Sequence, residues 1–108
     1  MKDIYSHIET HVDESIAQLF EMVRQPSISA QKRGFDKAPG LMKQILERNG
    51  FKAEIVPVPN DGLPSVYGFM AAAQNPDAAP TLLFYCHYDV QPVDPLDLWD
   101  TDPFEPTR

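Results

Sequence analysis

The first quarter of the chain carries hydrophobic residues at helical spacing. Between residues 3 and 24 they recur every three or four positions, which predicts an amphipathic helix; they are Ile4, Ile8, Val12, Ile16, Leu19, Phe20 and Val23. Pro26 disfavours helical angles at the residue before it, so we expect the helix to stop by Gln25. Residues 27–29 then follow as a loop.

A second helix is predicted over residues 36–48. Asn49-Gly50 supplies the left-handed conformation that closes many helices. Pro39 is tolerated in the first turn of a helix but not in its interior, so Pro39 is the alternative start of this helix.

The pattern then changes to that of strands. Residues 51–58 and 65–73 resemble strands, and Asn60-Asp61-Gly62 between them is typical of a turn. Residues 81–86 are a run without polar alternation, typical of a strand covered on both faces. Such a strand needs neighbours, and the proline-rich residues 87–108 should have almost no regular structure. The order predicts the N-terminal part of an α/β domain, with two helices followed by three strands and the third strand central in the sheet of the parent domain.

Composition narrows the functional classes. The chain has 108 residues, 43% of them hydrophobic, with 9 Lys+Arg against 16 Asp+Glu and a net charge of −7. We expect one domain, or part of one, with an ordinary core. The acidic balance argues against nucleic acid or an anionic membrane as a partner, because both attract Lys and Arg clusters. With no secretory signal and no apolar run near 18 residues, we expect a cytoplasmic protein.

His87 and Asp89 are the strongest candidates for chemistry. They follow the presumed buried strand, and ligands bind beyond the carboxyl ends of strands in open α/β sheets. A metal-binding histidine generally donates its other ring N–H to a carboxylate or a carbonyl. On spacing alone, two interpretations are equally favoured. In the first, His87 ligates a metal and Asp89 orients its ring. In the second, His87 is a hydrogen-bonded histidine at a strand end.

Other residues favour structural roles. His7 and His11 stand four apart on the first predicted helix, where a solvated polar face is favoured over a metal site. Cys86 could be a nucleophile beside His87, but a small buried hydrophobe is the favoured interpretation.

Two aromatic and two serine residues complete the set of candidates. Trp99 and Phe104 are expected to anchor the late loop to the core rather than to line a substrate pocket. Ser27 and Ser29 have no histidine or lysine at a meaningful spacing, so a serine nucleophile is unsupported.

The segment around His87 resembles a known family. The run from Leu82 to Pro92, together with Leu98-Trp99-Asp100 and Asp102-Pro103-Phe104, is similar to the first metal-binding motif of metallopeptidase family 20, the aminoacylase/carboxypeptidase/dipeptidase group. The residues of this motif are similar to those of the dipeptidase branch that includes the carnosine dipeptidases. The upstream order also agrees: a helix, Gln25-Pro26-Ser27-Ile28-Ser29, a second helix, Gly50-Phe51 and a strand.

The resemblance implies a fold and an activity. Residues 1–108 would be a partial catalytic domain, the N-terminal portion of a three-layer α/β/α zinc-peptidase domain, without the rest of that domain or a dimerisation domain. The enzyme would hydrolyse peptide or N-acyl amide bonds with two Zn²⁺ ions, and the parent family is often homodimeric. His87 would ligate zinc and Asp89 would support the catalytic site. The other ligands and the glutamate general base lie downstream of this motif in the family, so we expect the 108 residues alone to be inactive.

Two other interpretations stay open. The chain could be a non-catalytic truncated remnant or a docking fragment with no enzymatic role. A different metallohydrolase class ranks low, because its paired-histidine motif would need a second histidine at position 89, where this chain has Asp89. Apolar strand faces without neighbours would also make the isolated chain poorly soluble.

Overall fold

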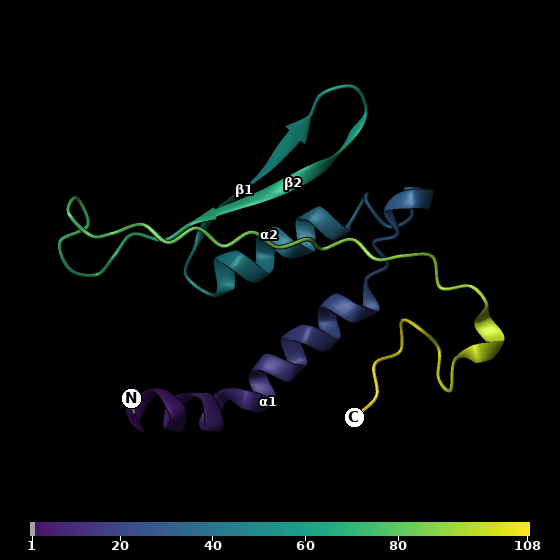
Figure 1. Ribbon diagram of the computed structural model, residues 1–108, viewed down its shortest axis with the longest axis horizontal. Coiled ribbons are helices and arrows are strands. Elements are labelled where there is room, and N and C mark those ends of the chain that lie inside the picture. Colours follow the sequence, from purple (N-terminus) through teal and green to yellow (C-terminus); the bar gives the residue numbers. More distant parts are fainter. Residues whose placement is uncertain (1) are drawn as a thin grey trace. The chain divides into compact units, whose positions relative to one another are not determined.

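The computed structural model describes residues 2–108. The chain divides into two compact units: the first holds Met1–Pro26 and Val93–Arg108, and the second holds Ser27–Pro92. Each unit is described by itself below, and Figure 1 labels the helices and strands.

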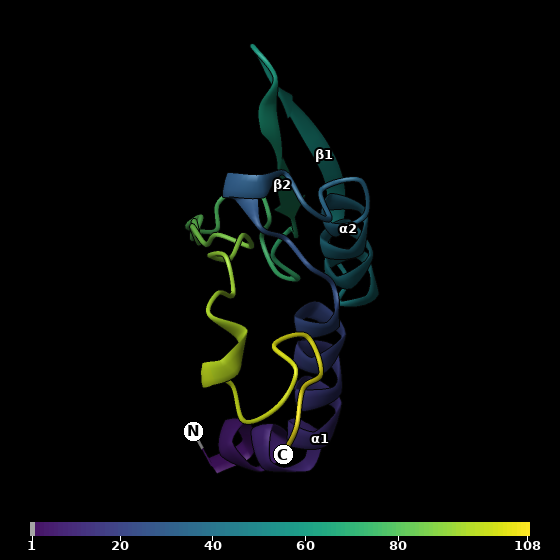
Figure 2. The same ribbon diagram turned by 90° about the vertical axis from the view of Figure 1, so that its right-hand side faces the viewer.

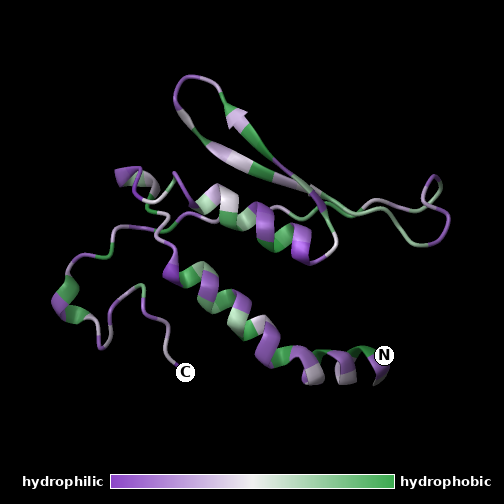
Figure 3. Ribbon diagram, turned by 180° about the vertical axis from the view of Figure 1, so that it is seen from behind, coloured by the Kyte–Doolittle hydropathy of each residue, from purple (hydrophilic) through white to green (hydrophobic). Residues whose placement is uncertain are grey.

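Helix α1, Lys2–Arg24, dominates the first unit. It confirms the predicted amphipathic helix and ends one residue before Gln25. Polar and hydrophobic residues alternate along it (Figure 3). Its hydrophobic positions are largely exposed, as shown by Ile4 at 62% and Leu19 at 52%. No helix within residues 2–108 is both long enough and apolar enough to span a membrane.

The late part of the first unit confirms the prediction of little regular structure. Its one helical element within the described residues is a 3-10 turn, Leu96–Leu98. The Trp99 indole N–H donates to the Val93 carbonyl over 2.8 Å, and Trp99 is 50% exposed. Trp99 therefore stabilises its own loop by this hydrogen bond. It was expected to anchor the loop to the core, but it is not packed into a core among the described residues. Phe104 is partly exposed.

Helix α2, Ala38–Arg48, confirms the second predicted helix. It begins between the two starts that the sequence offered, with Pro39 in the first turn, where the missing N–H costs no helical hydrogen bond. At its end, Gly50 has φ +88°, a left-handed conformation that glycine adopts without steric cost.

The strands form one antiparallel hairpin. β1, Lys52–Val58, pairs with β2, Gly62–Phe69, in a register that places Ile55 opposite Val66. β2 therefore begins three residues before the predicted strand at 65–73, because the tight turn lets pairing start at once. Helix α2 lies beside this hairpin in Figures 1 and 2.

The contact between α2 and the hairpin is close. A Cβ built on Gly68 of β2 would lie 3.1 Å from Cδ1 of Leu46, a residue of α2. Glycine at this position lets the helix approach the sheet more closely than a larger residue would allow.

The prediction of a third strand is wrong for this structure, and its central place in a parent sheet stays a prediction. Residues 81–86 are extended but pair with no strand among residues 2–108, and the sheet has two strands. The four residues from Leu82 to Tyr85 are each 79–92% exposed. The two strands of a hairpin are joined by a short turn, so each has its partner nearby in sequence. Residues 81–86 need partner strands that the described chain does not place beside them. The fold is thus mixed α/β, and the three layers expected from the resemblance are not formed by residues 2–108.

The expected ordinary core is also absent from the described residues. The buried apolar side chains are those of Ile28 and Ala38, each 1% exposed, and Pro39. Ser27 is the one buried polar residue among those described, at 6% exposure. All four belong to the second unit, so the best-packed part of the described chain lies around residues 27–39.

Candidate metal-ligand site

Two short segments of the second unit pair beside His87. The Val90 N–H donates to the Ser27 carbonyl over 3.0 Å, and Ile28 forms a parallel bridge with Val90. The Ser27 hydroxyl donates to the Tyr88 carbonyl over 2.7 Å. We call this arrangement of residues 27–29 and 88–90 the backbone clamp. It fixes the main chain directly after His87.

Tyr88 adds side-chain contacts to the clamp. Its hydroxyl donates a hydrogen bond to the Pro64 carbonyl, and its ring lies 5.6 Å from the Phe35 ring, centroid to centroid. Burial, and secondarily the charge of Asp89, raise the pKa of Tyr88 above its ordinary value. The phenol therefore stays protonated at neutral pH and remains a donor to Pro64.

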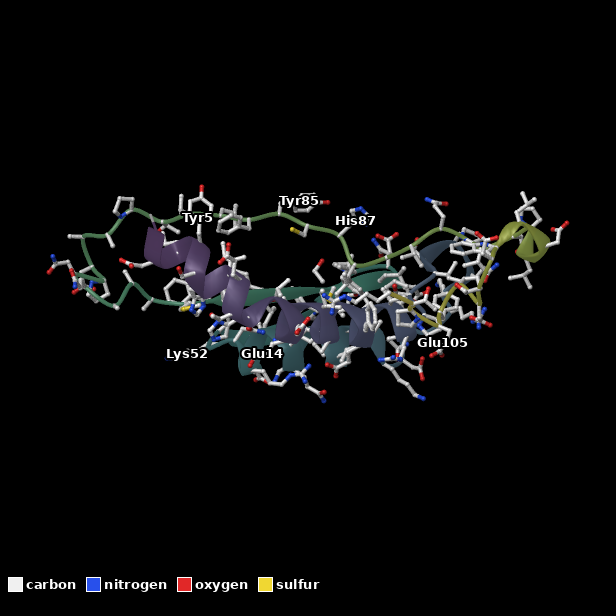
Figure 4. All side chains as sticks on the ribbon, turned by 90° about the horizontal axis from the view of Figure 1, so that it is seen from below. Tyr5, Glu14, Lys52, Tyr85, His87 and Glu105 are labelled. Carbon is white, nitrogen blue, oxygen red and sulfur yellow. The ribbon has the colours of Figure 1, made fainter. Side chains whose placement is uncertain are left out.

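The predicted contact between His87 and Asp89 is present. His87 Nδ1 lies 3.0 Å from the Asp89 carbonyl oxygen and 3.2 Å from Asp89 Oδ1. Both of these atoms accept hydrogen bonds, so Nδ1 is the donor and carries the proton in the neutral ring. The lone pair of the neutral ring is then on Nε2. The His87 side chain is 78% exposed and extends outward from the chain (Figure 4), so Nε2 is accessible to a ligand.

Asp89 is held ionised by its neighbours. The Ser29 hydroxyl, and after it the hydrogen bond and charge of His87, lower the pKa of Asp89 below 3.8, while partial burial opposes them. The sequence interpretation assigned Ser29 no role. The sequence offered one signal for such a role, the alternation Ser27-Ile28-Ser29. Successive side chains of an extended segment point to opposite faces, so burial of Ile28 turns the two hydroxyls to the other face.

The described residues do not form a complete metal site. Within residues 2–108, no three His, Cys, Asp or Glu side chains come together as a metal ion would require. His87 with its oriented ring fits one position of a zinc site, and a catalytic zinc needs at least two more protein ligands.

His7 and His11 stack on α1 with ring centroids 4.0 Å apart. His11 Nδ1 lies 2.7 Å from the His7 carbonyl, a contact that uses this nitrogen within the helix. The two rings gather no third ligand among the described residues.

Cys86 corrects a sequence prediction. It was expected to be a small buried hydrophobe, but it is exposed. The reason is the one that leaves the run before it uncovered: no strand or helix of the described chain packs over residues 81–86.

Comparison with known proteins gives matches to two kinds of metallohydrolase. The chain is 25% identical over 118 aligned residues to Cys-Gly metallodipeptidase DUG1 of Saccharomyces cerevisiae, an alignment that covers 97% of this chain and 24% of that protein. It is 39% identical over 68 residues to succinyl-diaminopimelate desuccinylase of Bordetella pertussis, covering 63% of this chain and 16% of that protein. The desuccinylase of Legionella pneumophila is 37% identical over 86 residues, covering 80% and 20%.

No family model matches the chain, and no solved structure does. The chain spans 16–24% of the length of these relatives. The yeast match covers nearly the whole chain, the motif around His87 included, and both kinds of relative are metallopeptidases of one family. The chain is therefore a homologue of the metallopeptidases of family 20, and it corresponds to part of their length.

Proposed function

We propose that this chain supplies part of the catalytic site of a zinc-dependent hydrolase that cleaves peptide or N-acyl amide bonds. His87 is one zinc ligand, and Asp89 is the carboxylate that supports it. The observation that carries the proposal is the fixed ring of His87. Two acceptor oxygens of Asp89 hold Nδ1–H, which leaves the Nε2 lone pair at an exposed position.

The residues of the chain have separate tasks. Asp89 keeps the proton on Nδ1 and makes the imidazole a stronger ligand. Its lowered pKa keeps it ionised throughout the pH range in which histidine is neutral. The backbone clamp holds Tyr88 and Val90, so both ends of the segment that carries Asp89 are tied down.

When bound, zinc would supply Lewis-acid chemistry for the amide carbonyl and for water. One ligand from residues 2–108 does not hold it for catalysis. The complete site would hold two Zn²⁺ ions, with further ligands beyond those found here. We therefore propose that the 108 residues alone are inactive.

The substrate class follows from the two kinds of relative. One is named for a Cys-Gly dipeptide and the others for removal of a succinyl group from succinyl-diaminopimelate. Hydrolysis of a peptide or N-acyl amide bond accommodates both names. The cytoplasmic location and a homodimer remain predictions from the sequence and the family resemblance.

A chimaera tests the proposal. Residues 1–108 replace the matching segment of yeast Cys-Gly metallodipeptidase DUG1, and both Cys-Gly hydrolysis and bound zinc are measured. His87→Ala should lower hydrolysis at least about 100-fold, because a ligand matters more than the groups that orient it, and bound zinc should fall. His11→Ala on α1 is the matched control and should change neither quantity.

A second measurement uses the 108-residue chain itself. During a Zn²⁺ titration followed by ¹⁵N NMR of the imidazoles, Nε2 of His87 should shift before the ring nitrogens of His7 and His11. Full activity and zinc content in the His87→Ala chimaera, or a first shift at the α1 histidines, would contradict the assignment.

A further inference from the structure

Ser27 is the buried polar residue of the backbone clamp. It is 6% exposed, and Ile28 beside it is 1% exposed. The Ile28 N–H donates to the Arg33 carbonyl over 3.0 Å, and the Arg33 N–H donates to the Ile28 carbonyl over 3.1 Å. Burial and this pair of hydrogen bonds hold the main chain of residues 27–28. Ser27 is therefore a firm support for the segment that follows His87.

Ser27 contacts both peptide groups that flank Asp89. Its hydroxyl donates to the Tyr88 carbonyl over 2.7 Å, so it holds the peptide group between Tyr88 and Asp89. Its carbonyl accepts from the Val90 N–H over 3.0 Å, so it holds the peptide group between Asp89 and Val90. Because peptide groups are planar, a residue turns only about the two bonds that join its flanking groups. With both groups held by one residue, the main chain of Asp89 keeps one orientation.

The second of these peptide groups also contacts the imidazole. In a trans peptide the carbonyl oxygen and the N–H point in opposite directions, and the bond between Asp89 and Val90 is trans. The Val90 N–H points to Ser27, so the Asp89 carbonyl points away from Ser27. His87 Nδ1 lies 3.0 Å from this carbonyl oxygen and 3.2 Å from the Asp89 carboxylate. The main-chain carbonyl is thus the nearer acceptor for the Nδ1 proton.

The side chain of Tyr88 does not replace the Ser27 hydroxyl. Its phenol donates to the Pro64 carbonyl, and its ring lies beside Phe35. These contacts hold the side chain, but the peptide group between Tyr88 and Asp89 can still turn about its flanking single bonds. The Ser27 hydroxyl removes that freedom, and its burial keeps water from competing for the Tyr88 carbonyl.

We propose that Ser27 is a positioning residue for His87. It fixes the main chain of Asp89, the Asp89 carbonyl then accepts Nδ1–H, and the proton is kept away from Nε2. The contacts of Ser27 and of His87 Nδ1 carry these steps. The use of the free Nε2 lone pair by a metal rests on the proposed function.

The direct test uses the metal-free 108-residue chain. ¹⁵N NMR at about pH 8.5, where histidine is neutral, reports whether the proton of His87 is on Nδ1 or Nε2. The wild-type chain should show mainly Nδ1–H. Ser27→Ala removes the donor to Tyr88, so the Nδ1–H to Nε2–H ratio should fall at least about twofold, the low end of the effect of one neutral hydrogen bond.

Two further variants separate positioning from folding. Ser27→Cys keeps nearly the same side-chain size with a weaker donor, so its ratio should lie between those of the wild type and Ser27→Ala. Ser15→Ala removes another hydroxyl that donates to a main-chain carbonyl, that of His11 on α1, and should leave the His87 ratio unchanged.

The fold of each variant is checked at the loop that supports Ser27. The amide resonances of Ile28 and Arg33 should stay in place in Ser27→Ala, because their hydrogen bonds do not use the hydroxyl. A wild-type ring with mainly Nε2–H, or an unchanged ratio in a folded Ser27→Ala chain, would overturn the proposal. If Ser27→Ala does not fold, Ser27→Cys decides, and a ratio equal to that of the wild type overturns it.

The metal-dependent part is measured in the chimaera. Ser27→Ala should weaken zinc affinity about threefold, below the roughly 10-fold to 100-fold effect of a group that contacts the ligand directly. If the ratio shifts but His87→Ala leaves zinc and activity intact, the positioning role holds and the proposed function fails. If His87→Ala abolishes activity but Ser27→Ala does not change the ratio, the proposed function holds and the role of Ser27 fails.

Discussion

Residues 82–85 and residues 87–90 follow one another along one extended segment of the second unit, and their contacts differ sharply. The first stretch is apolar, 79–92% exposed and unpaired among the described residues. The second stretch is hydrogen-bonded to Ser27 and to Pro64. The exposed ring of Tyr85 can be compared with the clamped segment after His87 in Figure 4.

The difference shows which features need the whole sheet. A doubly covered strand requires neighbours on two edges and two faces, so a hairpin and one adjacent helix do not complete it. The clamp requires one short partner segment, and residues 27–29 provide it. The orientation of His87 is therefore established without the three-layer fold that the family resemblance implies.

The largest expected effect is at the buried anchor of the clamp. Ile28→Ala should destabilise the second unit by about 2–4 kcal/mol, because it removes a fully buried side chain. Hydrogen exchange of the Val90 amide, which donates to Ser27, should accelerate at least about 30-fold. Ile55→Ala is the matched control, since Ile55 is 42% exposed, and it should have a smaller effect. Equal effects at the two positions would remove the contrast between clamped and open segments.

An intermediate effect is expected on acidification. The folded-state pKa of Asp89 lies below 3.8, so its contacts contribute fully above pH 3.8 and are lost as the pH falls through the lower folded value. The side-chain carboxyl of Asp89, followed by ¹³C NMR, should titrate below 3.8. In Ser29→Ala its midpoint should rise toward 3.8. A midpoint at or above 3.8 in the wild-type chain would show that the carboxylate is not held.

The smallest effect is expected in the open stretch. Leu83 is 86% exposed, so Leu83→Glu should change the stability of the isolated chain by less than about 0.5 kcal/mol. It should also reduce self-association in sedimentation velocity, because it interrupts an exposed apolar run. Leu46→Glu, on the face of α2 beside Gly68, is the comparison and should destabilise the unit. A large loss of stability from Leu83→Glu would show that this run is covered in solution.

The sequence predicted elements whose causes are local. The apolar spacing of α1, the first-turn Pro39 of α2 and the turn at Asn60-Asp61-Gly62 act over a few residues, and their elements formed within four residues of the predicted bounds. The contact of His87 with Asp89 was predictable for the same reason, because two positions along the chain keep the groups within reach.

The remaining features depend on residues far apart in sequence. The run at 81–86 looks like a strand by composition, but pairing depends on partners that its own residues do not specify. The effect of Ser29 on the pKa of Asp89 could not be foreseen, since the two residues are 60 positions apart and nothing in the local alternation identifies the partner. Cys86 was misplaced because its burial was inferred from that same unpaired run.

The separation of the clamp partners also orders the folding of the second unit. Ser27 and Tyr88 are 61 residues apart, whereas Val58 and Gly62 meet across a turn. Closing the longer loop costs about 2 kcal/mol more in chain entropy than closing the turn. We therefore expect the hairpin to form before the clamp. The geometry at His87 would then be gained late in folding.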